Sequence, residues 1–182
     1  MEQVIPFTHQ LLRMSLDHKD TVIDATAGNG LDTVFLAANC AHVHAFDIQR
    51  DALRKTEERL KDHGLANATL HLKSHEHIDE VAEGSIKAVV FNLGYLPGGD
   101  KTITTMRETT LDAIKKALSL VMEEGIVAVT LYPGHPEGNK EAEAVEAYLK
   151  ALDKTRYTVL KYQFVNSKDA PYSLITKKKR KD

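Results

Sequence analysis

Short apolar and β-branched runs alternate with helical patterns along this chain, and this alternation is what most constrains its fold. Strands are expected at residues 21–25, 42–46, 69–73, 88–92, 126–131, 158–164 and 173–177. Helices are expected at residues 7–16, 31–40, 50–63, 105–122 and 140–152, with a weaker helix at 77–82. Such alternation predicts βαβ units and a parallel sheet, hence an α/β fold of about seven strands. The last two strands lie close in sequence, which predicts an antiparallel hairpin whose final strand can insert beside its neighbours.

The bulk properties of the chain favour one compact domain. Its 182 residues are enough for a substantial core, and residues 1–182 are expected to form a single domain. The one cysteine, Cys40, excludes an intramolecular disulfide and is typical of a reducing compartment. Neither a long apolar run nor a signal-peptide pattern is present, so we expect a cytoplasmic protein with no membrane partner. The net charge of −2 gives no indication of a DNA partner, although "KKKRK" at 177–181 is either a solvated tail or a phosphate contact.

The stretch "DATAGNG" joins the first expected strand to the helix after it. Glycines at such a joint allow a sharp turn and close approach of a ligand to the backbone, and the helix start presents free N–H groups. Gly28 and Gly30 have the spacing of the first two glycines in the dinucleotide-binding fingerprint G-x-G-x-x-G, but the third glycine is missing. Asp24 and Asp32 would repel a pyrophosphate and favour a ligand with positive charge, although Asp32 can also simply cap the helix.

The second expected strand ends at Asp47, 17 residues after Gly30. A carboxylate at this place can accept hydrogen bonds from both hydroxyls of an adenosine ribose, and the Gln49 amide can reach the adenosine edge. Either feature alone is most often only a turn or a helix cap. Together they predict a ligand that contains adenosine.

Two further motifs lie at the same edge of the predicted sheet. Asn92 ends the fourth strand within "FNLGYLPGGDK", and the loop at 97–99 is long enough to form a pocket wall. The segment "LYPGHPEG" follows the fifth strand and carries Tyr132 and His135. Open α/β sheets bind their ligands beyond the carboxyl ends of the strands, so these polar groups are candidates for the reacting edge.

These motifs resemble those of the class I S-adenosylmethionine-dependent methyltransferases. The segments "PFTHQLL", "DATAGNGLDT", "FNLGYLPGGDK" and "YPGHPEG" occur in the same order in the family described as putative rRNA methylases. The resemblance implies a Rossmann-like class I methyltransferase fold with a mostly parallel sheet, S-adenosylmethionine as cofactor, and an N-terminal helix at about 7–16 that covers the cofactor side. "NLGY" resembles the Asn/Asp-Pro-Pro-Tyr motif of enzymes that methylate nitrogen, although Leu93 and Gly94 replace its prolines.

The resemblance also implies a role for each matched residue. Asn92 would accept hydrogen bonds from the substrate amine and Tyr95 would stack on the substrate base, as the catalytic pair. The cofactor-binding residues would be Asp24, Thr26, Gly28, Asn29, Gly30, Asp47, Ser74, His75 and Asn92. Gln49 is included with them because of its position just after Asp47. The substrate-binding residues would be Leu93 and Gly94 from the motif, with Tyr132 and His135 from their place at the same edge.

Members of this family include a transferase that methylates the aminomethyl group on the wobble uridine of certain tRNAs. The resemblance therefore implies conversion of aminomethyl-(2-thio)uridine to methylaminomethyl-(2-thio)uridine, with the anticodon arm of tRNA as partner. An anticodon arm is wider than one such pocket, so we expect a homodimer. Methylation of rRNA or of a small amine, and a non-catalytic adenosine-binding regulator, are the alternatives. No metal is expected, because the nine histidines carry no HExxH motif and no cysteine pair accompanies them.

Overall fold

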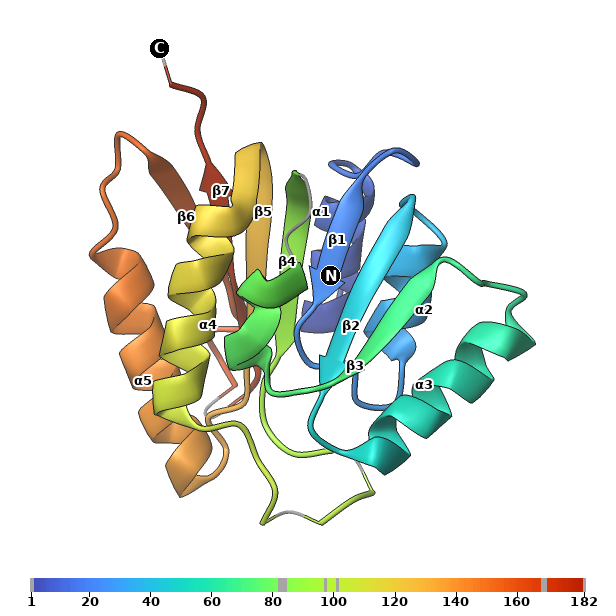
Figure 1. The fold of residues 1–182 in the computed structure, drawn as a ribbon. Helices are drawn as coiled ribbons and strands as arrows, with labels where there is room; N and C mark the ends of the chain where they lie inside the picture. The colour runs from blue at the N-terminus through green and yellow to red at the C-terminus, as the bar shows by residue number, and fades with distance from the viewer. Residues whose placement is uncertain (1, 82–84, 97, 101, 168–169, 182) are drawn as a thin grey trace.

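The structure, a computed structural model, describes residues 2–81, 85–96, 98–100, 102–167 and 170–181. A seven-stranded sheet lies between two layers of helices (Figure 1). The strands are β1 (Thr21–Asp24), β2 (His42–Asp47), β3 (Ala68–Leu72), β4 (Ile86–Asn92), β5 (Val121–Leu131), β6 (Tyr157–Tyr162) and β7 (Tyr172–Lys178). The helices are α1 (Val4–Arg13), α2 (Leu31–Ala37), α3 (Arg50–Asp62), the 3₁₀ helix η1 (His75–Val81), α4 (Arg107–Leu120) and α5 (Pro136–Lys150).

The strand order is β3-β2-β1-β4-β5-β7-β6. Strands β1 to β5 are all parallel, whereas β7 is inserted antiparallel between β5 and β6. This arrangement confirms the mostly parallel sheet and the terminal hairpin predicted from the sequence. The order reverses between β1 and β4, so the connections leave these two strands in opposite directions and open a crevice beyond their carboxyl ends.

Each face of the sheet buries its own apolar cluster. Helices α1, α2 and α3 cover one face, over a cluster that includes Leu12, Val22 and Leu36. Helices α4 and α5 with η1 cover the other face, where Phe46 and Phe91 are completely buried. Burying a side chain of this size contributes roughly 1.5–3 kcal/mol, so both layers hold the strand ends in place.

Two helices begin earlier than their sequence patterns predict. Helix α1 begins at Val4 with Pro6 in its first turn, where proline removes no intrahelical hydrogen bond, and it ends at Arg13. Helix α5 begins at Pro136 because the His135 side chain caps it by accepting a hydrogen bond from the Gly138 N–H, and proline suits the first helical position.

Two other elements differ from the prediction as well. Strand β5 begins at Val121 because Val121 pairs with Ile86 before a register shift, so the strand extends five residues ahead of the expected 126–131. The weak helix expected at 77–82 is a 3₁₀ helix from His75, and residue 82 lies outside the described residues.

Candidate active site

Three neighbouring strands end at the crevice where the strand order reverses. Asp24 ends β1, Asp47 ends β2 and Asn92 ends β4, and their following loops gather at the lower edge of the sheet in Figure 1. Thr26, which stands where a glycine is more usual in the class I motif, accepts a hydrogen bond at 2.7 Å from the Asn92 backbone N–H. The Thr26 hydroxyl therefore ties the glycine loop to the end of β4.

The glycine loop is held against β2 and α3. The Gly28 N–H donates to one carboxylate oxygen of Asp47 at 2.9 Å, and the Gln49 N–H donates to the other at 2.8 Å. The Arg59 guanidinium donates to the Asn29 carbonyl oxygen at 2.8 Å. These contacts bring Asp47 beside the loop, as the spacing of the two motifs predicts.

Gly30 is required by its backbone and by its neighbour. Its φ of +80° lies in the left-handed region, and a Cβ there would lie 2.8 Å from the Cα of Thr56 on α3. We expect Gly30→Ala to lower the free energy of unfolding by more than about 2 kcal/mol, since conformational strain and overpacking each cost about 1–2 kcal/mol or more. Gly64→Ala is the matched control, because Gly64 has φ +65° and no atom within 4 Å of its Cβ position. Equal losses for the two variants in chemical denaturation would contradict the close approach of α3.

Three carboxylates make the crevice acidic. Asp24 is fully buried and accepts hydrogen bonds from the Thr33 hydroxyl at 2.6 Å and from the Thr26 N–H at 3.2 Å. Burial, with the nearby charges of Asp32 and Asp47, raises the pKa of Asp24 to about 7. Burial also raises the pKa of Asp47. A ligand with positive charge would relieve this repulsion.

The raised pKa of Asp24 predicts that binding of a cationic ligand depends on pH. A pKa of about 7 leaves Asp24 largely protonated below that pH, whereas a bound cation favours the ionised form and lowers the pKa. Binding of S-adenosylmethionine should therefore release a proton, and its affinity should rise between about pH 5.5 and 7 by up to about tenfold per unit. Calorimetry in buffers of different ionisation enthalpy measures both quantities. Asp24→Asn should flatten the profile, and an equally flat profile for the unaltered chain would disprove the coupling.

The loop after β4 lies over the glycine loop. The Leu93 side chain is buried and its N–H donates to the Thr130 carbonyl oxygen at 3.0 Å. The Leu96 Cδ1 atom lies 3.6 Å from where a Cβ on Gly28 would stand. Tyr95 is exposed at this edge. Two residues of the motif, at positions 97 and 101, lie outside the described residues.

The loop after β4 lacks the two prolines of the related motif, and the buried carboxylate of Glu141 anchors it instead. The Gly94 N–H donates to the Thr105 hydroxyl at 2.9 Å, and that hydroxyl donates to Glu141 at 2.8 Å. The Thr110 hydroxyl donates to the other oxygen of Glu141 at 2.7 Å, and burial raises the pKa of this carboxyl. Sequence reasoning missed Glu141 because it lies among other acidic residues. Its spacing from Val145, four residues on along a buried helix face, was the available signal.

The structure brings the predicted acceptor residues together. The pKa of Tyr132 is raised by burial and by the Asp32 charge, and the neighbouring Asn92 side chain offsets part of this rise. The Tyr95 and His135 rings lie 5.8 Å apart between centroids. His135 Nδ1 accepts from the Gly138 N–H, and His135 Nε2 is buried with no hydrogen-bond partner among the described residues.

Ser74 and His75 lie in the loop after β3 and at the start of η1. The Ser74 hydroxyl accepts a hydrogen bond from the Glu76 N–H at 3.4 Å. The His75 ring is buried beside Phe91, 3.5 Å from the Thr110 hydroxyl, and burial lowers its pKa to about 4. The His75 side chain thus packs in the interior, and the cofactor roles of both residues stay predictions.

Three other histidines, His42, His44 and His71, lie on β2 and β3. His44 and His71 contact each other at 3.2 Å, and burial lowers the pKa of His44 to about 4. Within the described ranges, no group of three or more His, Cys, Asp or Glu side chains is arranged to hold a metal ion. No helix in the part of the chain that the structure describes is long and apolar enough to cross a membrane.

The sheet order, with a glycine loop after β1 and an acidic residue at the end of β2, defines a class I methyltransferase fold. Over residues 43–178 the chain matches the family described as Putative rRNA methylase, and it belongs to that family. The predicted fold, family and methyltransferase class are therefore confirmed. S-adenosylmethionine is the cofactor of that class.

Two solved structures are similar to this one along nearly the whole chain. A putative rRNA-methylase from Clostridium thermocellum has 37% identity and a TM-score of 0.95, with 98% of each chain covered. A putative methyltransferase from Streptococcus mutans, solved in complex with SAH, has 38% identity and a TM-score of 0.92, with 98% of this chain and 99% of that chain covered.

A curated relative has a more specific name. The chain is 36% identical over 180 residues to the "tRNA (mnm(5)s(2)U34)-methyltransferase, chloroplastic" of Arabidopsis thaliana. The match covers 90% of this chain but only 65% of the length of that relative.

Proposed function

We propose that this chain uses S-adenosylmethionine to methylate the aminomethyl nitrogen of wobble uridine in tRNA. The observation that carries the proposal is the pairing of a strand-end amide, Asn92, with an exposed aromatic ring, Tyr95, beside an acidic crevice. The similarity to a tRNA methyltransferase that acts on the same kind of nucleoside supports it. In this proposal Asp47 accepts hydrogen bonds from the ribose of the cofactor.

The site suits an amine acceptor because it positions the nitrogen and carries negative charge. S-adenosylmethionine, when bound, supplies a methyl group already activated on a sulfonium. The chain must align the nitrogen lone pair with that methyl at about 3 Å, which is mainly a matter of positioning. The Asn92 carbonyl oxygen would accept one N–H of the amine. The neutral amine would supply the electron pair of the new bond to carbon, the carbon–sulfur pair would leave with sulfur as a neutral thioether, and the product ammonium would lose one proton to solvent.

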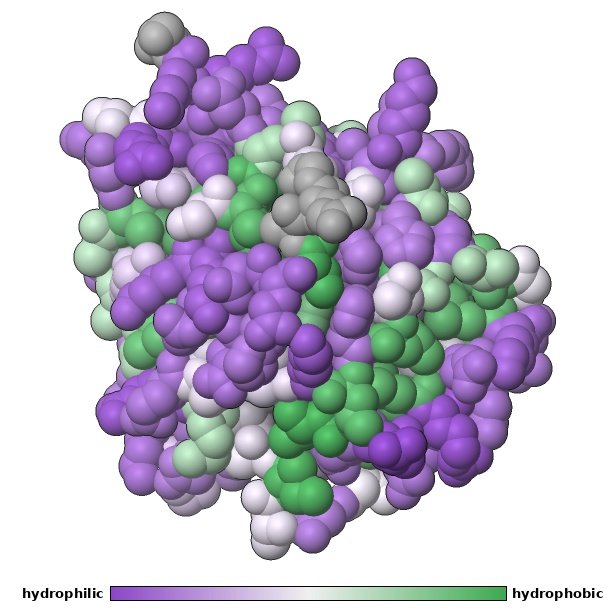
Figure 2. Space-filling view, viewed as in Figure 1, coloured by the Kyte–Doolittle hydropathy of each residue, from purple (hydrophilic) through white to green (hydrophobic). Residues whose placement is uncertain are grey.

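An apolar rim beside the crevice is suited to unstacked bases. The exposed hydrophobic residues Ile48, Tyr95, Ile103 and Met106 follow β2 and β4 in the chain. Figure 2 shows hydrophobic residues gathered in the lower middle of the molecule, on the side of these loops. RNA is read by sequence mainly where bases are splayed out and stacked on such side chains, as in an anticodon loop.

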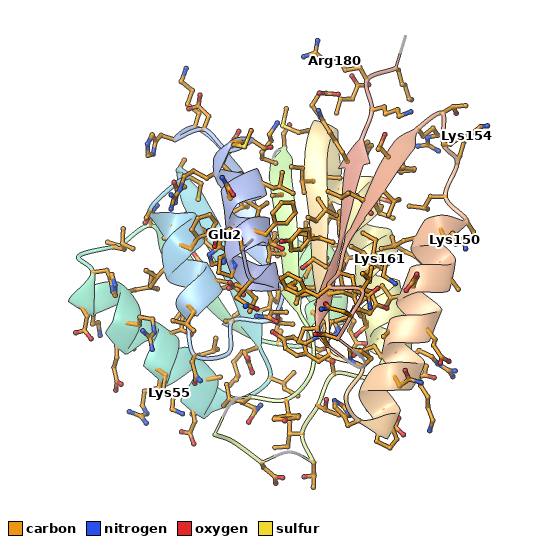
Figure 3. All side chains as sticks on the ribbon, turned by 180° about the vertical axis from the view of Figure 1, so that it is seen from behind. Glu2, Lys55, Lys150, Lys154, Lys161 and Arg180 are labelled. Atoms are coloured by element: carbon orange, nitrogen blue, oxygen red, sulfur yellow. The ribbon has the colours of Figure 1, made fainter. Side chains whose placement is uncertain are left out.

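The basic segment at 177–181 lies at the end of the sheet opposite the crevice. Lys177 pairs with Ile126 near the amino end of the parallel part of β5, and Arg180 is far from the crevice edge (Figure 3). The Lys178 ammonium donates to three backbone carbonyl oxygens at the end of α4, so part of the segment serves the fold. In a homodimer, the basic segment of the second copy would contact the tRNA phosphates. We therefore retain the homodimer as a proposal, and light scattering at working concentrations tests it.

A tritium-transfer assay with three acceptor classes tests the proposed function. Purified chain and labelled S-adenosylmethionine are incubated with tRNA that carries aminomethyl-uridine, with rRNA, and with small primary amines. We expect label in the tRNA alone. Label in rRNA or in the small amines would show that the proposed substrate is wrong. Label in none of the three acceptors, despite cofactor binding, would favour a non-catalytic regulator.

A further inference from the structure

Asp32 is an acidic residue at the crevice to which the proposed function gives no role. It lies in the first turn of α2, and its side chain is 10% exposed. One carboxylate oxygen lies 2.6 Å from Nε2 of His9 on α1. The other oxygen accepts a hydrogen bond at 3.2 Å from the side-chain nitrogen of Asn92. Asp32 thus joins the first helix of the chain to the proposed catalytic residue.

The contact with Asp32 determines which way the Asn92 amide points. A carboxylate can only accept hydrogen bonds, so Asn92 must turn its NH₂ group toward Asp32 and its carbonyl oxygen away. The Asn92 carbonyl oxygen is left to accept from another molecule.

His9 holds Asp32 in this geometry. Its ring stacks on Phe35 of α2, with the centroids 3.9 Å apart and the planes 2° from parallel. The neighbouring Thr8 is buried and donates to Ser173 of β7 at 2.9 Å, which anchors α1 to the sheet. The stack on Phe35 and the anchoring of α1 to the sheet therefore fix the position of His9.

We infer that Asp32 and His9 are positioning residues, which fix the Asn92 amide so that its carbonyl oxygen faces the substrate amine. The inference rests on the proposed function, since it assigns Asn92 to the acceptor. It explains why an acidic residue at the start of α2 points toward β4 and away from solvent. The competing role for Asp32 is a direct electrostatic contact with the cationic cofactor.

Kinetics separate the two roles of Asp32. We expect Asp32→Ala to lower kcat about tenfold and to leave the Kd for S-adenosylmethionine within about twofold, because the interaction acts on the acceptor. Asp32→Asn should recover much of the loss, since its carbonyl can still accept from Asn92. Asp51→Ala, which removes an exposed acid from the first turn of α3, is the matched control. A rise in Kd as large as the fall in kcat would overturn the inference in favour of cofactor binding.

A double-mutant cycle shows whether Asp32 acts through Asn92. In the Asn92→Ala background, adding Asp32→Ala should lower kcat by less than about twofold, because nothing is left to orient. His9→Ala should behave in the same way with a smaller single effect. Effects of Asp32→Ala and Asn92→Ala that multiply would overturn the inference.

A second readout does not depend on the substrate. In ¹⁵N-labelled protein, the side-chain amide pair of Asn92 is assigned by its loss in Asn92→Ala. In the unaltered chain the hydrogens of this pair should exchange slowly with water. In Asp32→Ala and His9→Ala their exchange rate should approach that of the side-chain amide of the exposed Asn166. An Asn92 pair that Asp32→Ala does not change would overturn the inference, whereas failure to methylate tRNA would overturn only the proposed substrate.

Discussion

Asn92→Ala should lower kcat for methyl transfer by about 100-fold and leave the Kd for S-adenosylmethionine within about twofold. Removing a preorganised group at a reacting centre costs about 10²–10³ in kcat, and positioning is the main task of this site. An interaction made with the reacting amine affects turnover more than cofactor binding. Single-turnover kinetics with saturating cofactor, beside calorimetric titration, measure the two quantities separately.

The control for Asn92→Ala is Asn39→Ala. Asn39 is also partly buried and its side-chain nitrogen donates to a backbone carbonyl at 2.7 Å, but it lies beyond the far end of α2. Asn39→Ala should leave turnover nearly unchanged. Full activity in Asn92→Ala, or equal losses in turnover and cofactor affinity, would move the reacting edge away from the end of β4.

Asp47→Ala should raise the Kd for S-adenosylmethionine by at least roughly tenfold, and by about 100-fold or more where both ribose hydrogen bonds are lost. The Asp47 carboxylate already accepts hydrogen bonds from the N–H groups of Gly28 and Gln49, and an ionised carboxyl has about four acceptor positions, so two remain for the ribose hydroxyls. Each such charged hydrogen bond is worth about 1.5–3 kcal/mol, and 1.4 kcal/mol corresponds to a factor of ten in affinity.

The loss of cofactor affinity in Asp47→Ala must be distinguished from the effect of a disordered glycine loop. At saturating cofactor, kcat should remain within a few-fold of the unaltered chain, because Asp47 does not contact the acceptor in this account. Thermal unfolding without ligand reports any change in the loop itself. An unchanged calorimetric titration would show that the ribose is bound elsewhere.

Local patterns predicted the parts of the site that each lie within one strand–loop unit. The glycine loop after β1, Asp47 at the end of β2 and Asn92 at the end of β4 follow from strand ends and short motifs, and the parallel sheet brings them to one edge. The hairpin insertion of β7 was predicted for a similar reason, since the last two strands lie close in sequence. The bounds of helices were less accurate, because side-chain caps such as that of His135 decide where a helix begins.

The supporting contacts were not predictable in this way. Asp32 meets Asn92 across 60 residues of sequence, and Thr105 meets Glu141 across 36. Such pairs leave no periodic pattern, and a buried acid in a charged helix resembles its exposed neighbours in sequence. The threonine at position 26 was predicted to bind the cofactor, although it departs from the usual motif. In the structure its hydroxyl binds the backbone of Asn92.

Mass spectrometry of nucleosides tests the central claim most directly. Purified chain is incubated with S-adenosylmethionine carrying a trideuterated methyl group and with tRNA that bears aminomethyl-uridine at the wobble position, and the digested nucleosides are analysed. The account predicts that aminomethyl-uridine is converted to methylaminomethyl-uridine with the label on the side-chain nitrogen, and that Asn92→Ala forms about 100-fold less of it per unit time. Unlabelled wobble uridine, or label on a ring carbon or a ribose oxygen, would contradict it.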